Sequence, residues 1–207
     1  GIVAGYLGTN ALECLIENVY VSGTVSGIQQ VGGIGGIFAK GTVRNCYADV
    51  KVIGSSRAGG IVAEPRNAVV VENCFATGTL YSTGNAGGIA GGLNGNNPTI
   101  KGCIAWNEQI DGEPVSGRVI GWQSNTYTKA TDCYAKKDMI IAWGPNKGMT
   151  GADANTAGTY DWGNNKTAIC HGITTENSVD AAKKIGWSTD IWDLSGVTPL
   201  LKSFNDK

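Results

Sequence analysis

The chain has 207 residues, of which 32 are Gly and only 3 are Phe and 2 are Met, and 16% are charged. This composition is poor in helix formers and rich in turn residues, so it favours a β architecture. The formal net charge is -1, from 16 Lys plus Arg against 17 Asp plus Glu, which argues against nucleic acid or an anionic membrane surface as a partner. No apolar run approaches the roughly 20 residues that span a bilayer, so we expect no membrane-spanning segment.

A repeat runs through the first two thirds of the chain. Its units begin with the glycine-rich heads GIVAG at 1–5, GGIGG at 32–36, GGIVA at 59–63, GGIAG at 87–91 and GRVIG at 117–121. Each head is followed by a second motif: ENVYVS at 17–22, RNCYAD at 44–49, ENCFAT at 72–77, KGCIAW at 101–106 and TDCYAK at 131–136. A fixed period of this length is typical of a solenoid, in which each unit forms one coil.

The cysteines of the second motif occupy equivalent places in successive units, together with a valine in the first unit: Val19, Cys46, Cys74, Cys103 and Cys133. Small apolar residues alternate with polar ones from this place onward, which indicates a strand whose cysteine side faces inward. The chain has no C-x-x-C motif of the kind found in zinc and redox sites. We therefore interpret the cysteines as a ladder of small buried side chains; Cys14 and Cys170 lie outside it and could pair or stay free.

The residue just before each ladder position tolerates left-handed backbone: Asn18, Asn45, Asn73, Gly102 and Asp132. We interpret this column as a corner between two strands. Each coil is then expected to hold three short strands: the GGI segment, the segment that ends at the corner, and the segment from the cysteine onward. The predicted fold is all-β, a parallel β-solenoid of about five coils, with the right-handed winding that crossover connections prefer.

A stripe of large side chains follows the ladder by one residue and should point outward: Tyr20, Tyr47, Phe75, Ile104 and Tyr134, with Trp106 at a further outward position. An exposed apolar stripe usually marks a contact surface, and rings that carry a hydroxyl suit sugar or protein partners. The alternative is that the stripe stabilises the sheet by ring stacking or lies under a loop.

The period fails after about residue 140, so we divide the chain into solenoid repeats at 1–140 and an irregular loop with a C-terminal cap at 141–207, packed together as one structural domain. The sequence predicts a short helix in this cap, with Asn177 or Ser178 as its N-cap and Gly186 just past its end. The loop holds a weak calcium candidate in Asp153, Asn155 and Asp161, with an ordinary Gly/Asn-rich loop as the default. No cofactor is predicted.

The residues offer little for catalysis. His171 is the single histidine, so any nucleophile with a histidine base would have to be built around it, beside Cys170. A glycan-active enzyme needs a pair of carboxylates on one exposed face. No outward-facing column of the repeat carries an acidic residue in successive coils. We therefore predict a protein that is not an enzyme.

The units GGIGGIFAKGTVRNCYADVKVIG and GGIAGGLNGNNPTIKGCIAW resemble the GLUG repeat of bacterial cell-surface proteins and immunoglobulin A peptidases. The resemblance covers roughly residues 1–137, and a segment resembling IGWSTDIWDLSGVTPLL often closes such arrays. It implies an extracellular or cell-surface bacterial protein, with the repeats outside any catalytic domain. The metallopeptidase motif H-E-x-x-H is absent from this chain, so the activity of some relatives does not carry over.

The resulting hypothesis is a non-catalytic binding, adhesion or spacer module of a larger bacterial surface or secreted protein. Its expected partners are a host or bacterial glycan or protein, and an upstream domain of the same parent chain, because the sequence begins inside a coil. The alternative is a glycan-active enzyme, a polysaccharide lyase or glycosidase, in which residues 141–170 fold over one face of the solenoid. A glycan-binding assay distinguishes the two hypotheses. A binding module retains the glycan without releasing product, whereas an enzyme releases product.

Overall fold

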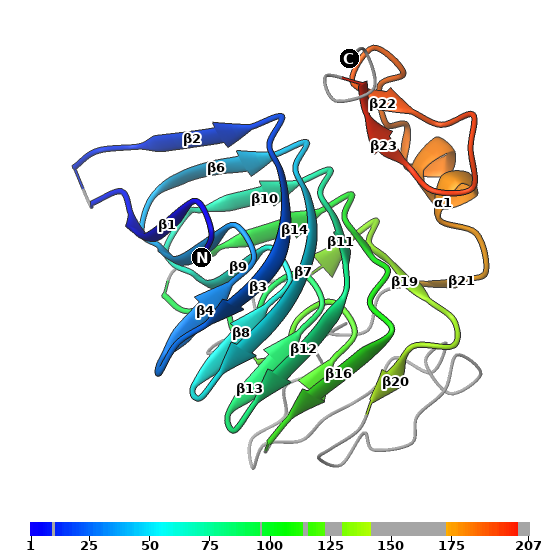
Figure 1. The fold of residues 1–207 in the computed structure, drawn as a ribbon. Coiled ribbons are helices and arrows are strands. Elements are labelled where there is room, and N and C mark those ends of the chain that lie inside the picture. The colour runs from blue at the N-terminus through cyan, green and yellow to red at the C-terminus, as the bar shows by residue number, and fades with distance from the viewer. Residues whose placement is uncertain (10, 96, 114–115, 123–129, 142–172, 203–207) are drawn as a thin grey trace.

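The computed structural model describes residues 1–9, 11–95, 97–113, 116–122, 130–141 and 173–202. The chain winds into a parallel β-solenoid of about five coils, closed on one side by a small C-terminal unit (Figure 1). Successive coils contribute neighbouring strands to the same four parallel sheets, which we name A to D. This confirms the predicted fold class.

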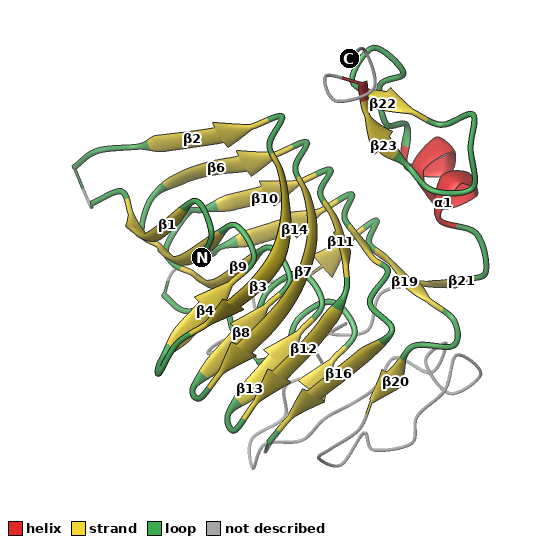
Figure 2. Ribbon diagram, in the orientation of Figure 1, coloured by secondary structure: helices red, strands yellow, loops and turns green. Residues whose placement is uncertain are grey.

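In the first three coils the sheets follow one another in the order A, B, C, D (Figure 2), and sheet A has its described strands in these three coils only. Sheet A contains β1 (Ala4–Leu7), β5 (Gly35–Phe38) and β9 (Val62–Pro65). Sheet B contains β2 (Cys14–Glu17), β6 (Gly41–Arg44), β10 (Val70–Glu72), β14 (Thr99–Lys101) and β18 (Ala130–Thr131). Sheet D contains β4 (Gln30–Gly32), β8 (Arg57–Gly59), β13 (Asn85–Gly87) and β17 (Ser116–Gly117).

Sheet C has the most strands of the four, because several coils contribute two short strands to it, one after the other. Its strands are β3 (Tyr20–Ser26), β7 (Tyr47–Gly54), β11 (Phe75–Thr77), β12 (Thr79–Ser82), β15 (Ile104–Ala105), β16 (Gln109–Gly112), β19 (Tyr134–Lys136), β20 (Ile140–Ile141) and β21 (Ile173–Thr175). In this sheet the register stacks the aromatic column as the repeat predicts: Tyr20, Tyr47, Phe75, Ile104 and Tyr134 pair in turn.

The corner between sheets B and C has the left-handed backbone that its residue types predict. The φ angle is 55° at Asn18, 52° at Asn45, 51° at Asn73, 58° at Gly102 and 51° at Asp132. Asn and Asp adopt this conformation at a smaller cost than other non-glycine residues. The same turn therefore recurs in every coil and keeps the coils in register.

The prediction of three strands per coil was wrong, because the glycine-rich head is a turn between two strands. Gly33 and Gly60 lie between the strand of sheet D and the strand of sheet A in their coils. A Cβ on Gly33 would lie 2.2 Å from the carbonyl oxygen of Gly60, and one on Gly60 would lie 2.0 Å from that of Gly88. Only glycine permits so close an approach of neighbouring coils, so the GG pair forms the D to A turn.

The interior of the solenoid is a column of small and branched apolar side chains that includes the cysteine ladder. Cys46, Cys74, Cys103 and Cys133 are buried and free, and each Sγ lies 3.1 to 3.4 Å from the carbonyl oxygen two residues before it. The ladder interpretation is therefore confirmed. Cys14 is half-buried and unpaired among the described cysteines, and Cys170 lies outside them.

The C-terminal cap consists of α1 (Ser178–Ile185) and a two-stranded antiparallel sheet of β22 (Trp192–Asp193) and β23 (Leu200–Leu201). The helix begins at its N-cap Asn177, whose side chain accepts hydrogen bonds from the N–H groups of Val179 and Asp180. It ends at Gly186, with φ 89°. Both ends match the prediction. Within the described residues no helix has the length and apolarity needed to cross a membrane.

Candidate functional site

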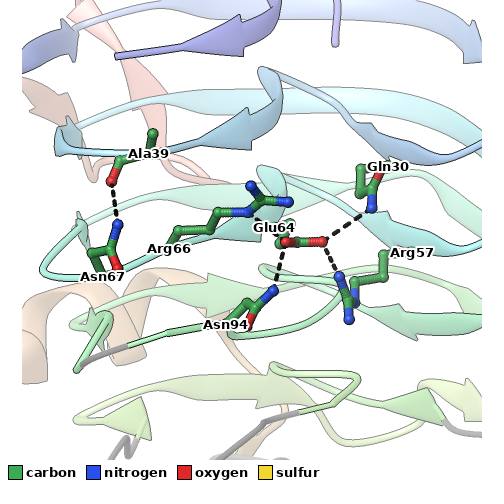
Figure 3. Close-up of polar contacts among 7 residues, drawn as sticks. All are labelled: Gln30, Ala39, Arg57, Glu64, Arg66, Asn67 and Asn94. Carbon is green, nitrogen blue, oxygen red and sulfur yellow. Dashed lines mark hydrogen bonds and ion pairs between the residues drawn. The ribbon is translucent and has the colours of Figure 1, made fainter. Parts of the chain in front are cut away.

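A buried carboxylate on the outer side of sheet A is the centre of the most elaborate polar cluster among the described residues. Strand β9 carries Glu64, whose side chain has no solvent exposure. Its Oε2 accepts hydrogen bonds from Gln30 Nε2 at 3.1 Å and from Nη1 of Arg57. Its Oε1 accepts from Nε of Arg66 at 2.6 Å and from Nδ2 of Asn94 at 2.9 Å (Figure 3). Four donors from neighbouring coils therefore converge on one carboxylate.

Two of the donors come from sheet D and two from the bridge just past β9, and this placement follows from the turn at the glycine-rich head. Gln30 and Arg57 occupy adjacent strands, β4 and β8 of sheet D, and face each other in the register of that sheet. Glu64 lies on β9 beyond the D to A turn, so its side chain meets theirs across the turn. Asn94 lies one coil further on and is bridged to Arg66 by backbone pairing. The cluster thus holds sheets D and A together across several coils.

The cluster carries an excess of positive charge. Two guanidinium groups, Arg57 and Arg66, share one carboxylate, Glu64. The Arg57 guanidinium also lies over the Trp122 ring, 4.9 Å from its centroid, a distance suited to a cation–π contact. Burial, and secondarily the charge of Arg66, lower the pKa of Arg57. An arginine so placed still keeps its charge at neutral pH, so the cluster has a formal charge of +1.

A polar pocket of about 370 Å³ adjoins the cluster at the corner between sheets A and B. Its lining comes from successive coils: Tyr6, Ala39, Arg66, Asn67, Asn94 and Gly95. Asn67 forms the corner with φ 50°, and its Nδ2 donates to the carbonyl oxygen of Ala39 at 3.3 Å (Figure 3). Arg66 and Asn94 belong to both the pocket and the Glu64 cluster, so the cluster fixes part of the pocket wall.

The arrangement around Glu64 suits binding and rigidity better than acid–base catalysis. A carboxylate offers about four acceptor positions, and each oxygen of Glu64 already accepts two hydrogen bonds. A general acid or base must exchange a proton with a substrate, and a carboxylate held by two guanidinium groups and two amides has no position left for it. Glu64 is therefore a positioning group for the side chains around it.

The aromatic stripe points out of the solenoid, but the cap covers much of it. The Tyr20 and Tyr47 ring centroids lie 4.9 Å apart, and those of Tyr47 and Phe75 lie 5.0 Å apart. Phe75, Ile104 and Tyr134 are buried, where exposed side chains were expected. The expected exposure was therefore wrong for these three, because the cap packs on their part of sheet C.

Tryptophans and the helix of the cap cover the stripe. The Trp187 ring meets Phe75 edge-on with the ring centroids 6.4 Å apart, and it stacks on Trp192 at 4.4 Å. Apolar residues of α1, including Val179 and Ala182, belong to the same buried cluster. The ammonium of Lys184 lies over the ring of Tyr134 at 5.9 Å. The stripe is thus largely an internal interface of this chain.

Three of the sequence-predicted binding residues keep part of their surface open. Tyr20, Tyr47 and Trp106 are half-buried and pack at the margin of the cap. Burial, its largest cause, raises the pKa of the Tyr47 phenol. A contact role for these residues stays a prediction. The calcium candidates Asp153, Asn155 and Asp161, together with His171, lie outside the described residues.

The Glu64 cluster and its pocket were not predicted from the sequence. The repeat reveals side chains that recur from coil to coil, whereas the residues aligned with Glu64 in sheet A are Tyr6 and Ile37. One signal was present: the stretch EPRN at 64–67 departs from the repeat and places two charges and an asparagine beside a proline. A local departure from a repeat is a useful sign of a specialised coil.

The sequence matches no protein-family model and no curated protein. The GLUG resemblance therefore stays an expectation. A search of solved structures found a "putative immunoglobulin A1 protease" from Bacteroides ovatus, to which this chain is similar with a TM-score of 0.72 and 25% sequence identity. The match covers 96% of this chain and 62% of that one, so this chain spans less than two thirds of its structural neighbour. Both chains thus share the solenoid architecture over nearly the whole length described above.

Proposed function

We propose that this chain is a non-catalytic binding module of a larger bacterial surface or secreted protein. The observation that carries the proposal is the state of Glu64, the buried carboxylate among the described residues. Both of its oxygens are saturated by donors, and two arginines more than balance its charge. Such a group organises a surface without taking part in proton transfer.

The solenoid is suited to binding because it presents side chains at fixed positions on its surface. Its coils fix side chains at the spacing of neighbouring strands, roughly 4.8 Å, so an extended ligand can meet several coils at once. Rigid presentation reduces the entropy that is lost when a partner binds. Two surfaces are available for this: the pocket beside Arg66, and the open part of the aromatic stripe at Tyr20 and Tyr47.

The role as a module of a larger protein draws support from the comparison. The structural neighbour from Bacteroides ovatus extends beyond the part that this chain matches, and its name connects it to immunoglobulin A1 cleavage. We infer that a chain of this kind serves beside a catalytic domain or on its own as an adhesive element at the cell surface. The GLUG-like repeat points to the same bacterial setting.

A panel of glycans and glycoproteins tests the proposal. The intact chain is expected to retain one or more members while releasing no product, as measured by mass spectrometry of the supernatant. Immunoglobulin A1 belongs in the panel and is expected to stay intact by gel electrophoresis after prolonged incubation. Cleavage of any glycan or of immunoglobulin A1 by the purified chain would overturn the non-catalytic proposal, and cleavage of a glycan would support the glycan-active alternative.

A further inference from the structure

We propose that the pocket at the corner of sheets A and B binds a sugar ring that carries a carboxylate, such as a uronic or sialic acid residue. This inference rests on the proposed binding function and names the ligand class for one of its surfaces. It is carried by three features of the pocket: an arginine with free donors, an exposed aromatic ring, and a wall fixed in advance by the Glu64 cluster.

Arg66 supplies the recognition of a carboxylate. Only its Nε is engaged by Glu64, at 2.6 Å, and its two terminal nitrogens make no hydrogen bond to any other residue that the structure describes. Its side chain is 34% exposed and lines the pocket. A guanidinium group offers paired donors that match the two oxygens of a carboxylate. Because the second arginine, Arg57, already balances Glu64, the charge of Arg66 is left for a ligand.

Tyr6 supplies a surface for the sugar ring. Its side chain lies on β1 at the edge of the pocket and is 57% exposed, although a large ring is usually more buried in a folded protein. Flat rings with a polar tip suit the apolar C–H face of a sugar, whose hydroxyls stay hydrated. Across the pocket, the amide of Asn94 is oriented by its hydrogen bond to Glu64, which leaves its oxygen as an acceptor for a hydroxyl.

The pocket is built before any ligand arrives. The N–H of Arg66 donates to the carbonyl of Phe38 at 2.8 Å, and that of Asn67 donates to Asn94 at 3.0 Å, so two coils hold this corner. Gly95 completes it with φ 83°, where a Cβ would lie 2.8 Å from Oδ1 of Asn67. The volume of about 370 Å³ falls at the lower end of the range of roughly 300–1,000 Å³ that small ligands occupy.

Calorimetric titration of the intact chain tests this inference, with trigalacturonate and sialyllactose as carboxylated probes, lactose as the neutral probe and sulfated lactose as a different anion. A carboxylated probe is expected to bind with a dissociation constant in the micromolar to millimolar range, on the order of tenfold or more tighter than lactose. Equal binding of lactose, or tighter binding of sulfated lactose, would overturn the carboxylate assignment.

Three variants locate the bound sugar. Arg66→Gln should remove the preference for the carboxylated probe, and Tyr6→Ala should weaken binding of every sugar by about tenfold. Tyr81→Ala is the matched control, because Tyr81 is 48% exposed on β12 of sheet C, away from the pocket, and its loss should change nothing. Tyr6→Ala keeps the test valid if Arg66→Gln disturbs folding, since an exposed ring at the edge of a sheet contributes little to stability.

The outcomes separate this inference from the proposed function. Binding of a carboxylated probe that neither variant weakens would show that the sugar lies elsewhere, which overturns the pocket and leaves the binding module intact. Conversion of any probe to product would overturn the non-catalytic function itself. A loss of affinity in Tyr6→Ala with full affinity in Tyr81→Ala supports the pocket.

Discussion

The indole Nε1 of Trp187 donates a 2.8 Å hydrogen bond to the backbone carbonyl of Gly102, the left-handed corner residue of the fourth coil. The donor lies in the cap and the acceptor in the solenoid, 85 residues apart in the chain. Trp187 is almost fully buried against Phe75 and Trp192. A polar contact inside an apolar interface sets the position of the cap, since few other placements would satisfy both groups.

Removing that hydrogen bond should destabilise the chain measurably. Trp187→Phe keeps a ring but leaves the Gly102 carbonyl buried without its donor, and we expect the free energy of unfolding to fall by about 1–3 kcal/mol. Trp187→Ala also opens a cavity and should cost about 3–5 kcal/mol. Val197→Ala is the control, because Val197 is 91% exposed in the same cap and its truncation should cost within about 0.5 kcal/mol. Urea unfolding measures all three, and a Trp187→Phe variant as stable as the control would contradict this account.

The Glu64 cluster and a surface ion pair of similar chemistry should respond very differently to the same change. Glu64→Gln puts an amide where two arginines require an acceptor, at a side chain that has no solvent exposure, and we expect a loss of about 3–5 kcal/mol. Glu17→Gln alters a pair with Arg44 in which both side chains are about two fifths exposed, so the loss should be within about 1 kcal/mol.

The ionic strength should affect the stability losses of Glu17→Gln and Glu64→Gln differently. Raising the ionic strength should reduce the already small effect of Glu17→Gln, since exposed charges are screened over about 10 Å or less at 0.1 M salt. It should leave the effect of Glu64→Gln nearly unchanged, because the carboxylate is shielded from solvent by its own partners. Equal losses in the two variants would mean that the cluster does not act as a buried ion pair.

The repeat in the sequence predicted the winding, the inward ladder and the corner because each of these is a local choice made again in every coil. Asn45 and Asn73 adopt the same backbone in the same place, and one residue later Cys46 and Cys74 point the same way. Repetition turns weak local preferences into a strong signal, since five independent units agree. The helix cap at Asn177 was predictable for a related reason: its side chain satisfies nearby N–H groups of the same segment.

The features that the sequence did not reveal are those that involve one coil alone or two distant segments. Glu64 has no equivalent in the other described strands of sheet A, so the repeat does not reveal it. The cap covers Phe75 and Tyr134. Its residues lie about a hundred positions from Phe75 in the sequence, and no local pattern specifies such a contact. Rings that the sequence of one segment predicts to face outward can therefore form a contact surface for another segment of the same chain.

The corner residues allow a test of backbone strain without a change in packing. Asn45 has φ 52°, a conformation that costs an alanine roughly 1–2 kcal/mol more than a glycine. We expect Asn45→Ala to lower the free energy of unfolding by about 1 kcal/mol, and Asn45→Gly to leave it nearly unchanged, as Gly102 already shows at the equivalent corner. Thermal unfolding of the two variants measures the difference. An alanine variant as stable as the glycine variant would mean that the corner adopts other backbone angles.

Two thiols of the cysteine ladder, Cys74 and Cys133, should make the free energy of unfolding fall in alkaline solution. Burial raises the pKa of the Cys74 and Cys133 thiols well above the usual value of 9.0, because the interior disfavours a thiolate. Well below the ordinary thiol pKa both thiols are protonated in the folded and unfolded states, so they add nothing to the pH dependence. Above it the unfolded thiols lose their protons while the folded ones keep them, so each lowers the free energy of unfolding by up to about 1.4 kcal/mol per pH unit.

Variants isolate that slope from the other groups that titrate at high pH. Urea unfolding under reducing conditions between about pH 8 and pH 10.5 should show a shallower decline in the Cys74→Ala/Cys133→Ala double variant than in the natural chain, although the double variant starts from a lower stability because it has cavities. Cys14→Ala keeps Cys74 and Cys133 and should decline as steeply as the natural chain. If all three slopes coincide, Cys74 and Cys133 are ionised as easily inside the solenoid as in the unfolded chain, and the dry surroundings inferred from their burial are wrong.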